Sequence, residues 1–352
     1  MSNLNFKKIT NWEYWPSYLF YIPVIPYAFL LAIKSRSFGF FSAVNPAIDG
    51  SGNGLESKYN TIQLIPDSYK PKTIFIKKGE QLINLLPKLT LKNINYPLII
   101  KPDIGFRGLL VQKINSESEL SEYITKYNSI NLIIQEFVDY KNECGIFYHR
   151  FPNEKTGKIT SITLKKYLTI IGDGKSSISE LILKDERAKI YVSLISEINK
   201  DKLETIPLLN EKIVLNIIGN HSKGTQFING NDLINKDLIN FFDKLSFDID
   251  GWYYGRVDIK YTTFEELIKG ENLKIIEING VISEPTHIYD ASSGTYLSAL
   301  KSIKKHWKLI YLIGRKNKKV NNANFTNLNY LIHLYFRYKK YIKKINKVST
   351  NQ

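Results

Sequence analysis

The sequence predicts an α+β protein built from several stacked lobes. Its length of 352 residues exceeds the roughly 100–200 residues that are usual for one domain. Short apolar strands alternate with polar helices from residue 96 onward, a pattern typical of mixed folds. A content of 43% hydrophobic and 23% charged residues is ordinary for a globular chain and excludes extensive disorder. The one cysteine, Cys144, excludes an intramolecular disulfide and a cysteine-based zinc cluster.

Residues 1–37 form an aromatic and apolar N-terminal segment. The run Tyr14–Ile33 has 20 uncharged residues, long enough to cross a bilayer. Its prolines, Pro16, Pro23 and Pro26, would each interrupt a helix. Three interpretations follow: a spanning helix, a segment lying in the membrane interface, and a segment packed on the protein's own core. The run lacks the small-residue cleavage site of a secretory signal.

Residues 38–95 are expected to form a short N-terminal α/β lobe. It would contain a buried strand at Phe38–Val44, a second strand at Thr73–Ile76 and a helix at Glu80–Leu86. The glycine-rich stretch 50–54 between them lacks the Gly-Lys-Ser/Thr spacing of a Walker A loop. It is therefore interpreted as a flexible turn, with a phosphate cradle as the alternative. Glu56, directly after it, is a candidate substrate residue.

The pattern becomes regular from Tyr96 onward. Further elements are expected in this order: strands at 97–102 and 109–113, a helix at 117–126, strands at 131–138, 145–151 and 159–164, a helix at 178–183, and strands at 254–259 and 273–280.

The two late strands carry the side chains most suited to hold a metal ion. Glu277 and Asn279 are two residues apart, so on a strand they face the same way. Asp258 lies on the preceding strand, and Arg256 shares its face. Oxygen ligands of this kind suit Mg²⁺ when substrate phosphates complete its coordination, and Arg256 is placed to meet phosphate or a developing oxyanion. A salt-bridged pair of edge strands is the structural alternative.

Upstream residues indicate a nucleotide site. Lys101 ends a strand before a loop with Gly105 and Gly108, so its ammonium can neutralise a phosphate while the glycines let the backbone approach. The stretch after the strand at 131–138 resembles the hinge of such a site, with an acid seven residues further on that would hold the ribose. The residues concerned are Glu136, Phe137, Val138, Asp139 and Glu143.

Taken in order, these motifs resemble the ATP-grasp superfamily, and within it the D-alanine–D-alanine ligase or carboxylate–amine ligase branch, over residues 96–313. The resemblance implies two α+β lobes that close over ATP. It implies phosphate contacts from Lys101, Gly105, Arg107, Gly108 and a later lysine, for which Lys166 is preferred over Lys165. It also implies one or two Mg²⁺ ions, for which Mn²⁺ can substitute, at Asp258, Glu277 and Asn279.

The activity implied by the resemblance is ATP-dependent amide-bond formation through an acyl phosphate, with a small carboxylate and a small amine as substrates. Arg256 and Lys166 would be the catalytic residues. After the E-x-N strand the chain departs from the family's small-residue loop and reads through Glu284, His287 and Tyr289. Glu284, His287 and His221 are therefore candidate substrate residues, while each histidine is alternatively structural. D-alanyl-D-alanine synthesis is not implied.

The net charge of +16 is concentrated at the end of the chain. Residues 291–352 hold 14 Lys or Arg and no Asp or Glu, which leaves 35 bases and 33 acids in residues 1–290. A basic tail, residues 314–352, is therefore expected on a nearly neutral body. The rival hypothesis is a nucleotide-sensing protein that binds a membrane surface or nucleic acid. A complete set of metal ligands favours the enzyme, so nucleic acid is not an expected partner. A cytoplasmic location follows, either free, peripheral to or anchored in the inner face of an anionic membrane.

Overall fold

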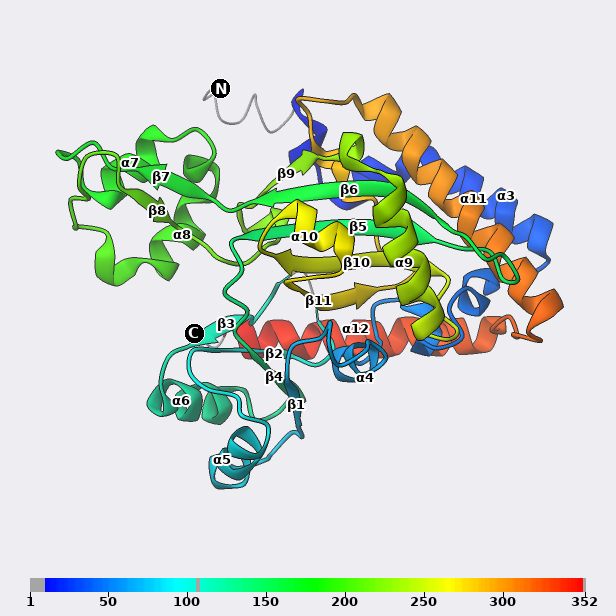
Figure 1. The fold of residues 1–352 in the computed structure, drawn as a ribbon, viewed down its shortest axis with the longest axis horizontal. Coiled ribbons are helices and arrows are strands. Elements are labelled where there is room, and N and C mark those ends of the chain that lie inside the picture. The colour runs from blue at the N-terminus through cyan, green and yellow to red at the C-terminus, as the bar shows by residue number, and fades with distance from the viewer. Residues whose placement is uncertain (1–9, 106–107, 351–352) are drawn as a thin grey trace.

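A five-stranded antiparallel sheet, ordered β11-β10-β5-β6-β9, lies at the centre of the molecule (Figure 1). The computed structural model describes residues 10–105 and 108–350. Side chains alternate between the two faces of each strand. Val257 and Ile259 therefore point into a core covered by α9 and α10, while Arg256 and Asp258 face the other way. The elements are β5 (Asn142–His149), β6 (Lys158–Lys166), β9 (Gln226–Asn229), β10 (Tyr254–Tyr261), β11 (Leu273–Asn279), α4 (Lys58–Gln63), α9 (Lys236–Asp248) and α10 (Phe264–Lys269).

A second antiparallel sheet has the order β1-β4-β2-β3 and lies below the first in Figure 1. Helices α5 and α6 cover it, and their apolar side chains, such as Leu85 and Leu120, are fully buried against its strands. The elements are β1 (Thr73–Ile76), β2 (Leu98–Pro102), β3 (Gln112–Ile114), β4 (Leu132–Glu136), α5 (Leu82–Leu91) and α6 (Glu117–Tyr127). The α+β prediction is confirmed.

The structure changes two expectations about residues 38–95. Strand β1 pairs with β4, so it belongs to the second sheet and this stretch has no sheet of its own. The strand expected at Phe38–Val44 is wrong, because the segment forms a short 3-10 helix, η3 (Phe40–Ala43). Phe40 and Val44 pack there against helix α11. A short apolar run cannot be assigned to strand or helix by periodicity alone.

A small lobe projects to the left in Figure 1 and has its own hydrophobic cluster. It pairs β7 (Thr169–Ile171) with β8 (Lys212–Val214) and packs them against α7 (Ile178–Lys184) and α8 (Val192–Ile198). Helix α7 begins at the residue where the sequence predicts the start of a helix. Ser177 and Glu180 form a capping box there, which satisfies backbone N–H groups at the start of the helix.

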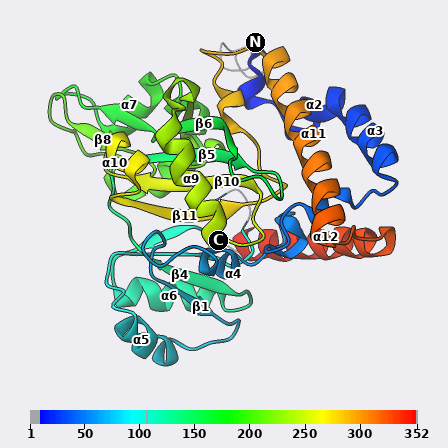
Figure 2. The ribbon, with the colours of Figure 1, turned by 45° about the vertical axis from the view of Figure 1, so that its right-hand side comes forward.

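The N-terminal segment packs along the body of the protein. It forms α2 (Ser17–Tyr21), η2 (Ile22–Val24) and α3 (Ile25–Ser35), with prolines at the starts of η2 and α3, where a missing N–H costs little. Phe20 and Val24 are buried against α11 and the turn before it, and α3 lies beside α11 in both views (Figures 1 and 2). Of the three interpretations, the structure favours the segment packed on the protein's own core.

By length and composition, Ser17–Ser35 could cross a membrane, and 22% of that window is buried in the protein. Its outward side chains, which include Ile22, Phe29 and Ile33, are more than half exposed.

The basic end of the chain forms two long helices, α11 (Tyr296–Val320) and α12 (Leu328–Thr350). The boundary expected at residue 313 therefore falls inside α11. Helix α12 runs back beneath the central sheet (Figure 2). There Ile345 is fully buried in the core of the second sheet, and the Tyr341 hydroxyl donates to the carbonyl of Ile104.

Candidate active site

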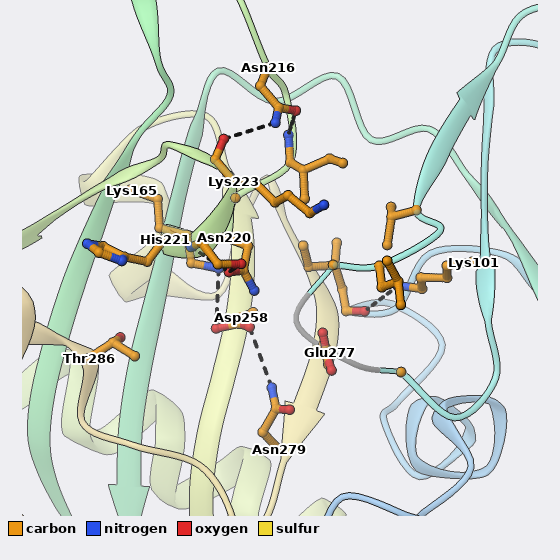
Figure 3. A pocket seen from close by; sticks show the side chains of 18 of the residues that line it. Lys101, Lys165, Asn216, Asn220, His221, Lys223, Asp258, Glu277, Asn279 and Thr286 are labelled. Atoms are coloured by element: carbon orange, nitrogen blue, oxygen red, sulfur yellow. Dashed lines mark hydrogen bonds and ion pairs between the residues drawn. The ribbon is translucent and has the colours of Figure 1, made fainter. Parts of the chain in front are cut away.

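A cavity of about 2230 Å³ lies between the two sheets and is lined by the polar face of the central sheet. Its other walls come from β2 and the loop after it, the end of β4, residues 214–223 and the N-terminal segment. Figure 3 shows Asp258, Glu277 and Asn279 on one wall and Lys101 facing them from another strand. Most of the residues that the sequence predicts for the site therefore share one cavity.

Asp258 and Glu277 lie directly opposite each other on the paired strands β10 and β11. Arg256 and Asn279 form the next cross-strand pair on the same face of the sheet. Arg256 grips Asp258 with two hydrogen bonds, from Nε to Oδ1 (2.9 Å) and from Nη2 to Oδ2 (3.1 Å). The Asn279 amide donates to Asp258 Oδ2 over 3.5 Å.

Both carboxylates stay charged at neutral pH although they are enclosed. Burial raises the pKa of Asp258, but Arg256 and Lys165 outweigh it and lower that pKa to about 2. Burial likewise raises the pKa of Glu277, and the Lys58 ammonium, which forms an ion pair with it, brings the pKa below its usual value. The sequence reasoning missed Lys58, which α4 presents one residue after its N-cap, Ser57.

Lys101 is placed in the cavity as predicted. Its ammonium donates to Gln135 Oε1 (2.9 Å) and to the backbone carbonyl of Ile276 (3.5 Å). Burial lowers the pKa of Lys101 to about 8, and the attraction of Glu277 offsets only part of that effect. A lysine held this way is poised to take an anionic ligand, because a phosphate would supply the missing countercharge.

The structure places Lys165, and not the preferred Lys166, in the cavity wall. Lys165 lines the cavity, and its ammonium lies 2.7 Å from Glu143 Oε1 and 3.5 Å from Asp258 Oδ1. Lys166 is exposed outside the cavity. Adjacent residues of a strand point to opposite faces, and pairing with β9 decides which of the two lysines faces inward.

The predicted hinge is placed only in part. Glu136, Phe137 and Val138 line the cavity, whereas Asp139 is exposed outside it. Glu143 is buried in the cavity wall and accepts hydrogen bonds from Lys165 and the Tyr167 hydroxyl. A ribose would have to compete with these two partners for the carboxylate.

The two glycines of the loop after β2 lie at the cavity between the sheets. Gly105 and Gly108 line it, and Arg107 lies outside the described residues. Gly108 has φ of +72°, which few other residues adopt without strain. A Cβ at Gly105 would lie 2.0 Å from Lys58 Cε, so a side chain here would displace the lysine that pairs with Glu277.

Three of the four candidate substrate residues line the cavity. Glu56 accepts from the backbone N–H of Gly54 (2.6 Å), and burial raises its pKa. His221 pairs with Glu13 (2.7 Å), and Glu284 accepts from the hydroxyls of two tyrosines. His287 lies outside the cavity and bonds to Ser161 Oγ (2.7 Å). A structural role is therefore favoured for His287, since burial lowers its pKa to about 4.

The chemistry of the donors fits a hard divalent cation. Two charged carboxylates and the side-chain amide of Asn279 lie on paired strands, and Mg²⁺ prefers oxygen ligands completed by phosphate or water. Within residues 10–105 and 108–350, no group of three or more His, Cys, Asp or Glu is placed to hold a metal. Any ion here would therefore need the amide of Asn279 or a bound phosphate to complete its ligands.

No family model matches the chain. It is 37% identical over 105 residues to the coenzyme γ-F420-2:α-L-glutamate ligase of Methanococcus maripaludis, a match that covers 26% of this chain and 33% of the relative. The chain thus spans about a third of the length of the curated relative that it matches.

Similar solved structures are also ligases. The D-alanine–D-alanine ligase of Bacillus anthracis is 14% identical over 77% of this chain and 72% of its own, with a TM-score of 0.43. The bifunctional glutathione synthetase of Pasteurella multocida is 14% identical over 71% of this chain and 36% of its own, with a TM-score of 0.37. The chain is similar to these ligases over the lengths given, and its own motifs resemble those of the ATP-grasp superfamily.

Proposed function

We propose that the protein is an ATP-dependent ligase that joins a small carboxylate to an amine. In the first step, a carboxylate oxygen of the acyl donor attacks the γ-phosphorus of ATP, and ADP leaves. In the second, the amine nitrogen, as the free base, attacks the carbonyl carbon of the acyl phosphate, the C–O bond to phosphate breaks, phosphate leaves, and the nitrogen releases a proton to water. The resemblance to C–N bond-forming ligases supports the reaction class.

The observation that carries the proposal is the cross-strand pair Asp258 and Glu277 with Arg256, Lys58, Lys101 and Lys165 around it. Four cations and two carboxylates in one enclosed cavity suit a polyanionic nucleotide and its metal. Mg²⁺, when bound, would offset the charge of the phosphate oxygens and orient them. Asp258, Glu277 and Asn279 would hold it.

The side chains of the protein would hold the substrates in place and stabilise their charges. Lys101 and Lys165 would contact phosphate oxygens, and Arg256 would stabilise charge that develops on the transferring group. Glu136 to Val138 would border the base, and Glu143 would turn from Lys165 toward the ribose. Gly105, Gly108 and residues 214–223 border the same cavity.

ADP formation tests the reaction. Purified full-length protein is incubated with ATP, Mg²⁺ and pairs of carboxylates and amines, and ADP release and product mass are measured. ADP that appears only with both substrates, with an amide of the summed mass less water, supports the proposal. Tight ATP binding with no ADP from any pair would favour the rival nucleotide-sensing function.

The need for ATP places the reaction in the cytoplasm. We also predict peripheral contact with an anionic membrane surface. The prediction rests on the exposed apolar face of the N-terminal segment and on helices α11 and α12, which contain no acidic residue.

A further inference from the structure

An apolar cavity of about 420 Å³ adjoins the active-site cavity. It lies between α3, η3, α11 and the loop after β11, and Val281, Ile282 and Trp307 line both spaces. Among the described residues that line it, Asn53 and the Trp307 indole nitrogen supply the polar side-chain atoms. Nothing in the ATP reaction needs such a space, because phosphates and metal ions are held by charged groups.

In the sequence, the acidic residue nearest to those that line this cavity is Glu284. Its two oxygens accept hydrogen bonds from the hydroxyls of Tyr21 and Tyr289. Arg256 donates to its backbone carbonyl (3.4 Å) and lies close enough for electrostatic attraction to its carboxylate. Among the salt bridges within the described residues, none involves Glu284. An anionic group in an aromatic surrounding is suited to receive a cation.

A continuous set of contacts joins Glu284 to the apolar cavity. The Tyr21 ring, whose hydroxyl binds Glu284, stacks on Trp307 at 6.2 Å between centroids and 7° between planes. Trp307 then forms part of the apolar wall together with Ala28, Phe29 and Ala32 of α3. The N-terminal segment therefore supplies both a partner of the carboxylate and one side of the cavity.

We propose that the amine substrate is a primary alkylamine, with its ammonium group at Glu284 and its hydrocarbon chain in the apolar cavity beside α3. This inference rests on the proposed ligase function and names the class of its amine. Arg256 lies beside the Glu284 backbone, so an amine held there would lie next to the group expected to face the acyl phosphate. The exposed apolar side of α3 would let such an amphiphile approach with its chain shielded from water.

Chain length gives the first test. Binding of n-alkylamines from propylamine to octylamine to the full-length protein is measured by calorimetry. Affinity should rise about fourfold per methylene, equivalent to about 0.8 kcal/mol, until the cavity is filled. Alkanols of equal length should bind more weakly, and alkyl sulfates should not compete. Affinity independent of chain length, or alkyl sulfates that bind as tightly as alkylamines, would overturn the inference.

Two matched variants on α3 locate the chain. Ala28→Trp would fill the cavity and remove the dependence on chain length, whereas Leu30→Trp, on the exposed side of the same helix, should retain it. Glu284→Gln should weaken alkylamine binding about 10- to 100-fold, because a hydrogen bond to a charged group is lost, while alkanol binding is unchanged. Equal behaviour of the two tryptophan variants would contradict the assignment of the cavity.

The binding assay separates this inference from the proposed function. Alkylamines that bind as described without ADP formation from any carboxylate would count against the ligase reaction alone. Amide formation from short polar amines, with no effect of chain length, would overturn the alkylamine inference and leave the ligase reaction supported.

Discussion

Asp258 and Glu277 face each other across two paired strands, yet each is neutralised by a different cation from a different part of the chain. Arg256 on the same strand grips Asp258, and Lys58, 219 residues away, pairs with Glu277. Two carboxylates placed side by side, Asp258 buried and Glu277 half-buried, repel each other unless countercharges hold both. The arrangement keeps both ionised, and a metal with its bound phosphates could take over the role of these cations.

The proposed metal ligands should be essential for turnover. Asp258→Asn and Glu277→Gln each remove an anionic oxygen, so Mg²⁺-dependent ADP formation should fall by about 100-fold or more. The exposed Glu265→Gln on α10 is the matched control. Circular dichroism and thermal melting check that the fold persists. Near-normal turnover of both variants at limiting Mg²⁺ would contradict the site.

The adjacent lysines of β6 provide an internal comparison. Lys165→Met removes the ammonium near Asp258 and Glu143, so ADP formation should be nearly abolished. Lys166→Met changes an exposed side chain and should leave the rate within about twofold, since exposed substitutions cost little. Steady-state ADP release decides between them, and the reverse result would restore the preference for Lys166.

Glu143 should contribute to ATP affinity. Glu143→Ala removes the proposed partner of the ribose, and affinity should fall about 10- to 100-fold, as expected for a hydrogen bond to a charged group. Tyr167→Phe deletes only a hydroxyl that binds Glu143 and should change affinity much less. Calorimetric titration with ATP measures both. An unchanged dissociation constant for Glu143→Ala would show that the hinge is misplaced.

ATP binding should weaken as pH rises through the lowered pKa of Lys101. Burial brings that pKa from 10.5 to about 8, so the ammonium loses its proton above that pH. The contribution of Lys101 to the stability of the fold changes with pH in the opposite direction. Between pH 8 and 10.5 the unfolded chain binds the extra proton, so this group makes the fold more stable as pH rises through the window. Titrations from neutral to alkaline pH should show the loss of affinity, and Lys101→Arg should flatten it.

Full-length protein is expected to sediment with anionic vesicles at low salt. A triple change of Ile22, Phe29 and Ile33 to Ser should reduce this, because their exposed apolar area is removed. The same change at Ile83 and Leu91, which are even more exposed on α5, serves as the control. High salt should release the triple variant, since only the basic helices then hold it. Protein that stays in solution at low salt would end the membrane hypothesis.

Local patterns in the sequence determined much of the site. The alternation of β10 places Arg256 and Asp258 on one face, and the E-x-N spacing of β11 does the same for Glu277 and Asn279. Lys101 before its glycine loop is equally local. These features depend on residues two to seven positions apart, and strand geometry alone decides how they point.

Tertiary structure decided what such patterns leave open. The pairing of β6 with β9 selected Lys165 over Lys166, and the packing of α4 brought Lys58 to Glu277. The Tyr14–Ile33 run was placed on α11 by contacts of Phe20 and Val24 with residues 264 to 283 positions away. Ion pairs and packing between distant segments depend on the tertiary arrangement of the backbone, and no local residue spacing encodes that arrangement. The free energy of such contacts arises only once both partners are buried together.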